Sequence, residues 1–154
     1  MIKLGTTWWR AVLGEMTRII KDRVQKDHKN ANGQTFKHYS KSYEKRKSAN
    51  KAKRKGESQS SYSTTPDMTL TGRTMADLGV SNITKDGGLI GWSTQGHIIR
   101  YLAEMKNYKV VNVGKSNPLG KPELDFFKKQ FSKKMSTELK KMSKQYSKTI
   151  TVNM

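Results

Sequence analysis

The sequence contains no cysteine, only three prolines and few large aliphatic side chains. Without cysteine there is no disulfide framework, no thiolate metal site and no cysteine nucleophile. The nine Leu, eight Ile, seven Val and four Phe residues make up only 28 of the 154 residues. A low aliphatic content with high net charge is typical of partly disordered chains. Three Trp, six Tyr and eight Met residues add apolar surface. We therefore expect a single domain over residues 1–154, with a small core that is firmer in an assembly.

Acidic residues are also scarce. The chain has 12 Asp and Glu residues against 31 Lys and Arg residues, which gives a formal net charge of +19. Such an excess of positive charge favours a polyanionic partner, DNA or RNA before anionic lipid. No stretch approaches the roughly 18 apolar residues that a membrane span needs, so we expect no membrane partner.

Apolar residues at helical spacing predict two amphipathic helices. The first is expected to begin at a cap formed by Thr6 or Thr7 and to end near His28, before the turn-forming sequence Asn-Ala-Asn-Gly. The second is longer and is expected over residues 121–147, with Pro122 tolerated in its first turn.

The residues between these helices predict short elements. A short helix or turn is expected from Phe36 to Lys47, and a short helix that begins at Thr71, turns Met75 and Leu78 inward and stops at Gly79. An Asp-Gly pair between apolar runs predicts a β-hairpin near residues 80–93. The remaining expectations are a helix over residues 95–107 and strands over residues 109–114 and 149–153. This order predicts an α+β fold with a small, mainly antiparallel sheet.

A basic, Ser-rich segment from about residue 45 to 66 contains no aliphatic side chain larger than Ala, so we expect a flexible loop. Residues 37–55 contain nine basic residues and one acid. Two interpretations remain open: the cations contact phosphates or an acidic partner without reading sequence, or they form a solvated mobile segment. The proposed contact residues are Lys45, Arg46, Lys47, Lys51, Lys53, Arg54 and Lys55.

The sequence matches none of the catalytic motifs considered for its residue types. His28, His38 and His97 show no metal-ligand spacing, and the Gly-x-Ser-x-Gly pattern of a nucleophile elbow is absent. Asp67 is interpreted as a turn residue and Asp77 as the solvent side of a short helix. We therefore expect a protein that is not an enzyme and that has no cofactor or metal.

Two sequence blocks carry a resemblance to a known family. The first block consists of Gly33, Phe36, Tyr39, Ser40, Tyr43 and Lys47, and the second of Asp67, Leu70, Thr71, Gly72 and Met75. Their order and spacing resemble the virion-morphogenesis or tail-completion proteins of tailed phages, in which a Gly-x-x-Phe step, a Tyr-Ser-x-x-Tyr step and a Lys precede Asp-Leu-x-x-Thr-Gly. Met68 stands where Leu is usual, and the segment after the hairpin keeps only a trace of the family pattern.

The resemblance implies a structural virion protein at the neck or the head-proximal end of the tail. It also implies a ring of identical subunits, with neighbouring neck, portal-side or tail proteins as partners and genomic DNA in the channel. The block residues, including the aromatic residues Phe36, Tyr39 and Tyr43, are then expected to serve packing. The alternative interpretation, from charge alone, is a stand-alone basic nucleic-acid-binding protein.

Overall fold

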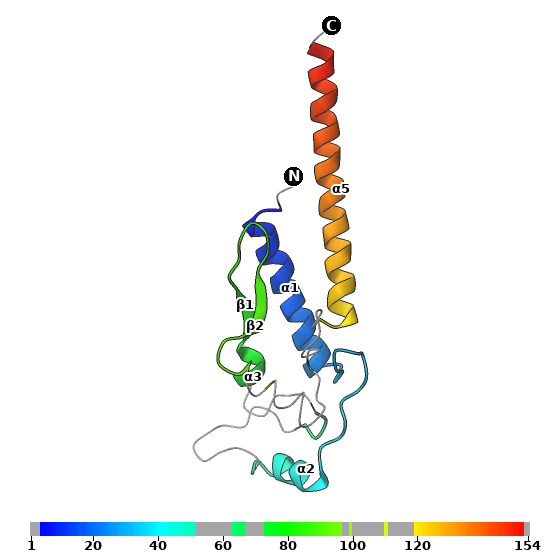
Figure 1. The fold of residues 1–154 in the computed structure, drawn as a ribbon. Coiled ribbons are helices and arrows are strands. Elements are labelled where there is room, and N and C mark those ends of the chain that lie inside the picture. The colour runs from blue at the N-terminus through cyan, green and yellow to red at the C-terminus, as the bar shows by residue number, and fades with distance from the viewer. Residues whose placement is uncertain are drawn as a thin grey trace.

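The computed structural model describes residues 4–51, 63–66, 73–96, 99, 110 and 119–152, with side chains described up to residue 145. The fold is α+β, as predicted from the order of elements. Helix α1 (Thr6–Gln25) is followed by α2 (Lys41–Ser48), α3 (Arg73–Ala76), strands β1 (Leu78–Ser81) and β2 (Leu89–Trp92), and the long helix α5 (Lys121–Val152). Helix α1 lies between the hairpin and α5, and α5 runs antiparallel to it (Figure 1).

Helix α1 provides the spine of the core. Its apolar stripe contributes Val12, Leu13, Met16, Ile20 and Val24, each at most 6% exposed. The predicted threonine cap is wrong, because Thr6 and Thr7 are already helical and Gly5 is the capping residue, without a side-chain hydrogen bond. The helix also ends at Gln25, three residues earlier than predicted, and the chain then turns through a left-handed His28 with φ 54°.

Two apolar clusters pack along this spine. Toward the carboxyl end of α1, the cluster contains Ile20, Val24, Phe36, Met75, Leu78, Ile99 and Val110. Toward the amino end, Val12, Leu13 and Met16 meet side chains from the hairpin and from the first turns of α5. The core is therefore a thin layer on either side of one helix, which agrees with the low aliphatic content of the chain.

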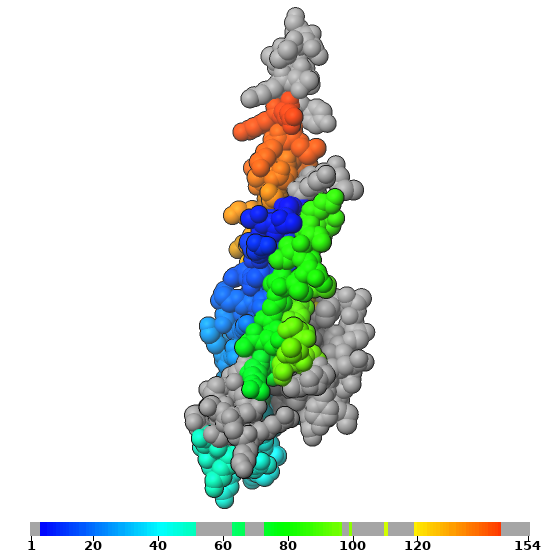
Figure 2. Space-filling view, turned by 90° about the vertical axis from the view of Figure 1, so that its left-hand side faces the viewer, coloured from blue at the N-terminus to red at the C-terminus, as the bar shows by residue number. Residues whose placement is uncertain are grey.

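The predicted hairpin is confirmed as an antiparallel pair with Leu78 opposite Trp92 and Ser81 opposite Leu89. Leu78 belongs to β1 and not to the preceding helix, because α3 ends at Ala76. Figure 2 shows the hairpin lying along α1, with α5 extending past both. The loop of the hairpin also packs on α1: a Cβ at Gly88 would lie 2.7 Å from Cδ1 of Leu13, so a larger residue here would require the Leu13 side chain to shift.

Helix α5 is longer than predicted and includes residues 149–152, where a final strand was expected. That strand prediction is wrong. β-branched residues such as Thr, Ile and Val favour strands only weakly, whereas adding a residue to an existing helix gains a hydrogen bond at little cost. No Gly or Pro follows Pro122 within the helix, so nothing stops its propagation.

The helix predicted over residues 95–107 is described only at its start, where Gly96 and Ile99 are helical. The strand predicted over residues 109–114 lies outside the described residues except for Val110, which forms a bend and is buried.

Candidate interaction surface

The first motif block folds as one continuous unit that leads from α1 into α2. Gly33 has φ 80°, a left-handed conformation that glycine adopts without strain. The side chain of Asn30 holds this turn, since its Oδ1 accepts hydrogen bonds from the backbone N–H groups of Asn32 and Gln34 at 2.9 and 3.0 Å. The chain then leaves the turn with Phe36, which is buried in the core at 3% exposure.

Helix α2 follows with a defined start and a defined end. Ser40 caps its first turn by accepting a hydrogen bond from the N–H of Tyr43. At the other end Asn50 has φ 57°, the Lys51 N–H donates to the Arg46 carbonyl and the Asn50 N–H donates to the Lys47 carbonyl. This pair of bonds is a Schellman motif. The prediction of a basic loop from about residue 45 is therefore wrong for residues 45–51, because Lys45–Ser48 is helical and the cap extends to Lys51, while residues 52–62 lie outside the described residues.

Two tyrosines and one lysine pack together at α2: Tyr39, which precedes the helix, and Tyr43 and Lys47 within it. The rings of Tyr39 and Tyr43 meet edge to face with centroids 4.8 Å apart. Nζ of Lys47 lies 5.0 Å from the centroid of the Tyr39 ring, within the range of a cation–π interaction. The side chain of Lys47 is fully buried, whereas the other basic residues of α2 are exposed.

This burial corrects the predicted contact set. Lys47 cannot reach a phosphate or a partner protein, and it acts instead in packing together with Tyr39. Lys45, Arg46 and Lys51 are exposed and share one end of the molecule, while Lys53, Arg54 and Lys55 lie outside the described residues. Helix α2 lies at the end of the molecule opposite to the carboxyl end of α5 (Figure 1). The described members of the predicted contact set that are exposed therefore lie at one tip of an elongated protein.

The second motif block is described only at Met75, which is 1% exposed and part of the core cluster. Asp67, Leu70, Thr71 and Gly72 lie outside the described residues.

A second charged feature was not predicted. Arg23 of α1 and Glu123 of α5 form a buried ion pair with Nε and Oε1 2.8 Å apart and side-chain exposures of 3% and 0%. Arg23 also donates to the carbonyls of Lys29 and Val110. The sequence signal that could have predicted a buried ion pair was the position of Arg23 within the apolar stripe of α1. A charged side chain on a buried face requires a partner of opposite charge. The partner of Arg23, one hundred residues away, could not be found from spacing.

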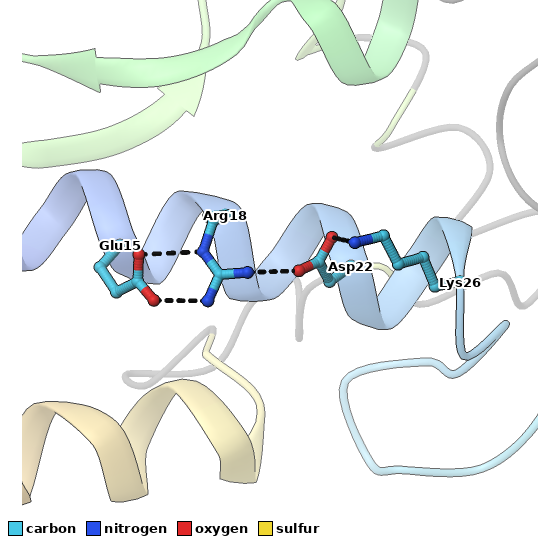
Figure 3. A network of polar contacts seen from close by, with 4 residues as sticks. All are labelled: Glu15, Arg18, Asp22 and Lys26. Carbon is cyan, nitrogen blue, oxygen red and sulfur yellow. Dashed lines mark hydrogen bonds and ion pairs between the residues drawn. The ribbon is translucent and has the colours of Figure 1, made fainter.

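A further row of charged residues runs along the outer face of α1 to its carboxyl-terminal cap, Lys26. Glu15, Arg18, Asp22 and Lys26 form a chain of ion pairs at spacings of three and four residues (Figure 3). The hydrogen bond from Arg18 lowers the pKa of the Glu15 carboxyl, and the hydrogen bond from Lys26 lowers that of Asp22. These acids are used within the helix and do not form a separate acidic patch.

The outward face of the hairpin carries a hollow of about 380 Å³. Its lining includes Gly79 and Gly91, which are directly paired, and the exposed Leu89. Asp77 is the titratable group of this lining. It does not face solvent from a helix, as predicted, but follows α3 and accepts bonds from the Ser93 hydroxyl and from the N–H groups of Thr94 and Gln95. A carboxylate occupied in this way has a structural role.

Among the residues that the structure describes, no helix is long and apolar enough to cross a membrane. Within the same residues, no three His, Asp or Glu side chains gather where they could hold a metal ion.

The chain matches no protein-family model, no curated protein and no solved structure.

Proposed function

We propose that the protein is a ring-forming connector or tail-completion component at the neck of a tailed-phage virion, through which genomic DNA passes. The observation that most supports the proposal is the folded state of the first motif block. Gly33 has the backbone conformation that favours glycine, Phe36 enters the core, and Tyr39, Tyr43 and Lys47 stack on one another. Each of these five positions of the first block thus has a structural reason for its residue type.

The architecture supports the same proposal. The core is a thin layer around α1, and the far half of α5 extends beyond it (Figures 1 and 2). A subunit of this shape gains stability when neighbours cover its surface. The partners proposed are other copies of the chain in a ring and the adjoining neck, portal-side or tail proteins. The protein would occupy the host cytoplasm before assembly and the virion afterwards.

The basic tip provides a contact to DNA in the channel or to an acidic neighbouring ring. Its proposed members are now Lys45, Arg46, Lys51, Lys53, Arg54 and Lys55, without the buried Lys47. Because phosphate contacts are electrostatic, such a contact weakens as salt rises and as charges are removed.

A second candidate function is a stand-alone nucleic-acid-binding protein. It is favoured by the exposed face of α2, where Lys41, Lys45 and Arg46 continue the basic run of the following segment. This candidate predicts a monomer that binds duplex tightly, whereas the connector predicts a ring or incorporation into particles with weak binding to free DNA.

Light scattering on the purified chain at low and high salt, with and without short duplex DNA, separates the two candidates. A ring-sized species without DNA supports the connector. A monomer that binds duplex and releases it at high salt overturns the connector in favour of the second candidate. If the chain is monomeric and binds no duplex, its presence or absence in intact particles decides the question.

A charge variant tests the role of the tip. Replacing the six basic residues by Ser is expected to leave folding intact and to reduce DNA retention in particles. The matched control removes six exposed cations elsewhere, namely Arg10, Lys26, Lys29, Lys85, Lys121 and Lys128. Equal effects of the two variants would show that only total charge matters and that the tip has no specific role.

A further inference from the structure

Helix α5 continues far past the element on which it packs. The last aromatic contact between α5 and α1 joins Phe131 to Trp8, whose ring centroids are 6.5 Å apart, and α1 begins only two residues before Trp8. Residues 132–152 remain helical beyond this contact. At 1.5 Å per residue they extend about 30 Å. Figure 1 shows this part of α5 projecting beyond the rest of the molecule.

The projecting part keeps the apolar stripe of the packed part. Phe131, Met135, Leu139 and Met142 recur at four, four and three residues, and we call these four side chains the distal seam. Phe131, Leu139 and Met142 are 38%, 56% and 40% exposed. A rotation of about 100° per residue places the four within roughly 80° of the helix circumference. The seam is thus continuous with the α1–α5 interface through Phe131, and beyond Phe131 no element among the described residues covers it.

The flanks of the distal seam differ from each other. On one side Glu138 bonds to Lys134 at 2.8 Å and to Lys141 at 3.1 Å. On the other side the helical rotation places three serines, Ser132, Ser136 and Ser143, whose small side chains permit close approach of a second helix. The back of the helix carries Lys133, Lys140 and Lys144. Residues 132–145 contain five Lys and one Glu, and that Glu is already engaged by two of the lysines.

We propose that the distal seam is the docking site for an amphipathic α-helix with acidic flanks, presented by a partner protein. A narrow seam suits one helix packed against another, as in the seam of a coiled coil. Two methionines suit a surface that adapts to a partner. The lysine flank supplies the charge that selects acidic side chains and suppresses basic ones.

The alternatives fit less well. A second copy would bring an equally lysine-rich flank against the first, and like charges in contact are unfavourable. Duplex DNA offers phosphates to the lysines but no apolar partner for Leu139 and Met142. A lipid surface requires a broad apolar face, whereas the four side chains of the seam cover only about 80° of the helix circumference. The inference goes beyond the proposed virion role and does not depend on ring formation.

The test uses the full chain and a defined probe. The probe is a labelled peptide of about three heptads with Leu at the seam positions and Glu at the flanks; a second peptide carries Lys in place of Glu. Fluorescence anisotropy is expected to show at least tenfold tighter binding of the acidic peptide, with a difference that narrows as salt rises. Leu139→Ser is expected to weaken that binding about tenfold. Its helix content, measured by circular dichroism, should be unchanged because Leu139 is more than half exposed.

Matched charge variants test which lysines of α5 contribute to binding of the acidic peptide. Lys134→Gln with Lys141→Gln should weaken binding of the acidic peptide and flatten its salt dependence. Lys133→Gln with Lys140→Gln removes the same charge from the back of the helix and should change affinity much less.

Several results would overturn the proposal. These are equal binding of the two peptides, binding that Leu139→Ser does not change, and no binding of the acidic peptide. The seam would be assigned to another partner if duplex DNA or phosphatidylglycerol vesicles bound through Leu139 in place of the peptide. The same would hold if the chain self-associated and Leu139→Ser abolished that self-association. A ring seen by light scattering without peptide binding would leave the virion role standing and remove only this inference.

Discussion

Arg23 of α1 and Glu123 of α5 form an ion pair that is almost fully removed from water and that joins the end of one long helix to the start of the other. Figure 1 shows these two helix ends side by side. Arg23 Nε donates to Glu123 Oε1 at 2.8 Å, and its two other nitrogens donate to backbone carbonyls. The second oxygen of Glu123, Oε2, has no hydrogen-bond partner among the described residues. One guanidinium group thus joins the carboxyl end of α1 to the start of α5, in addition to the aromatic contacts between the two helices.

We predict that Glu123→Gln lowers the free energy of unfolding by about 3–5 kcal/mol, because it leaves the Arg23 charge buried without its counter-ion. Urea unfolding followed by tryptophan fluorescence measures this change. The double variant Arg23→Met with Glu123→Leu should cost clearly less than the sum of the two single changes, since it removes both charges together.

Arg18 provides the control for this prediction. It pairs with Glu15 and Asp22 on the exposed face of the same helix (Figure 3), where water and salt screen the interaction. Arg18→Ala should therefore shift the urea midpoint far less than Glu123→Gln. Equal shifts would mean that burial gives the Arg23–Glu123 pair no special weight.

Substitutions at three glycines distinguish two reasons why a position requires glycine: a positive φ and a close contact at the place of the Cβ. Gly33→Ala should cost about 1 kcal/mol because its φ of 80° is strained for any residue with a Cβ. Gly120→Ala should cost about 1–3 kcal/mol for overpacking, since its Cβ would lie 2.5 Å from Glu123 Oε2 and 2.9 Å from the Ala31 carbonyl. Gly79→Ala is the control, with open space around the new Cβ and no positive φ. Thermal unfolding of the three variants tests the order, and a Gly79→Ala variant as unstable as Gly120→Ala would contradict it.

Periodicity predicted the two long helices because their apolar residues recur every three or four positions, and the Asp-Gly signal predicted the hairpin. The ends of the helices were harder to predict. The Thr-Ile-Thr-Val sequence near the end of α5 has the composition of a strand but continues a helix that is already formed. The start of α1 depends on the backbone of Gly5, which no side-chain pattern indicates.

The charged residues show a sharper limit. Lys45 and Lys47 are two residues apart in a uniformly basic run, and no sequence pattern distinguishes the exposure of one from that of the other. The structure buries Lys47 against Tyr39 and leaves Lys45 in solvent, because helix rotation turns the two side chains to different faces. Which face is inside depends on where α2 docks, and that is a tertiary property.

We predict opposite outcomes for these two lysines. Lys47→Ala should lower the free energy of unfolding by about 2 kcal/mol, through the lost cation–π contact and the lost packing of its aliphatic stem. Lys45→Ala should leave stability nearly unchanged, because the side chain is exposed. Guanidinium unfolding of both variants measures the difference. A stable Lys47→Ala variant would return Lys47 to the set of mobile contact residues.

The carboxylate of Asp77 provides a test against pH. The hydrogen bond from the Ser93 hydroxyl, followed by those from the N–H groups of Gln95 and Thr94, lowers the pKa of Asp77 from 3.8 to about 2. A carboxyl whose pKa is lower in the folded state stabilises the fold fully above its unfolded pKa, and this contribution is lost as pH falls through the folded pKa. The contribution of Asp77 should therefore be complete above about pH 4 and should disappear as pH falls toward about 2.

Asp77→Asn removes this titration. The variant should be less stable than the parent chain at neutral pH, because a neutral amide is a weaker acceptor for the three donors. Its stability should also fall less steeply between pH 4 and 2, so that the two acid-unfolding curves converge at low pH. Circular dichroism at a series of pH values measures both curves, and Asp125→Asn serves as a control on an exposed carboxyl of α5. Parallel curves for the Asp77→Asn variant and the parent chain would show that the Ser93, Thr94 and Gln95 donors do not hold an ionised carboxylate, and that the turn after β2 is stabilised by its backbone alone.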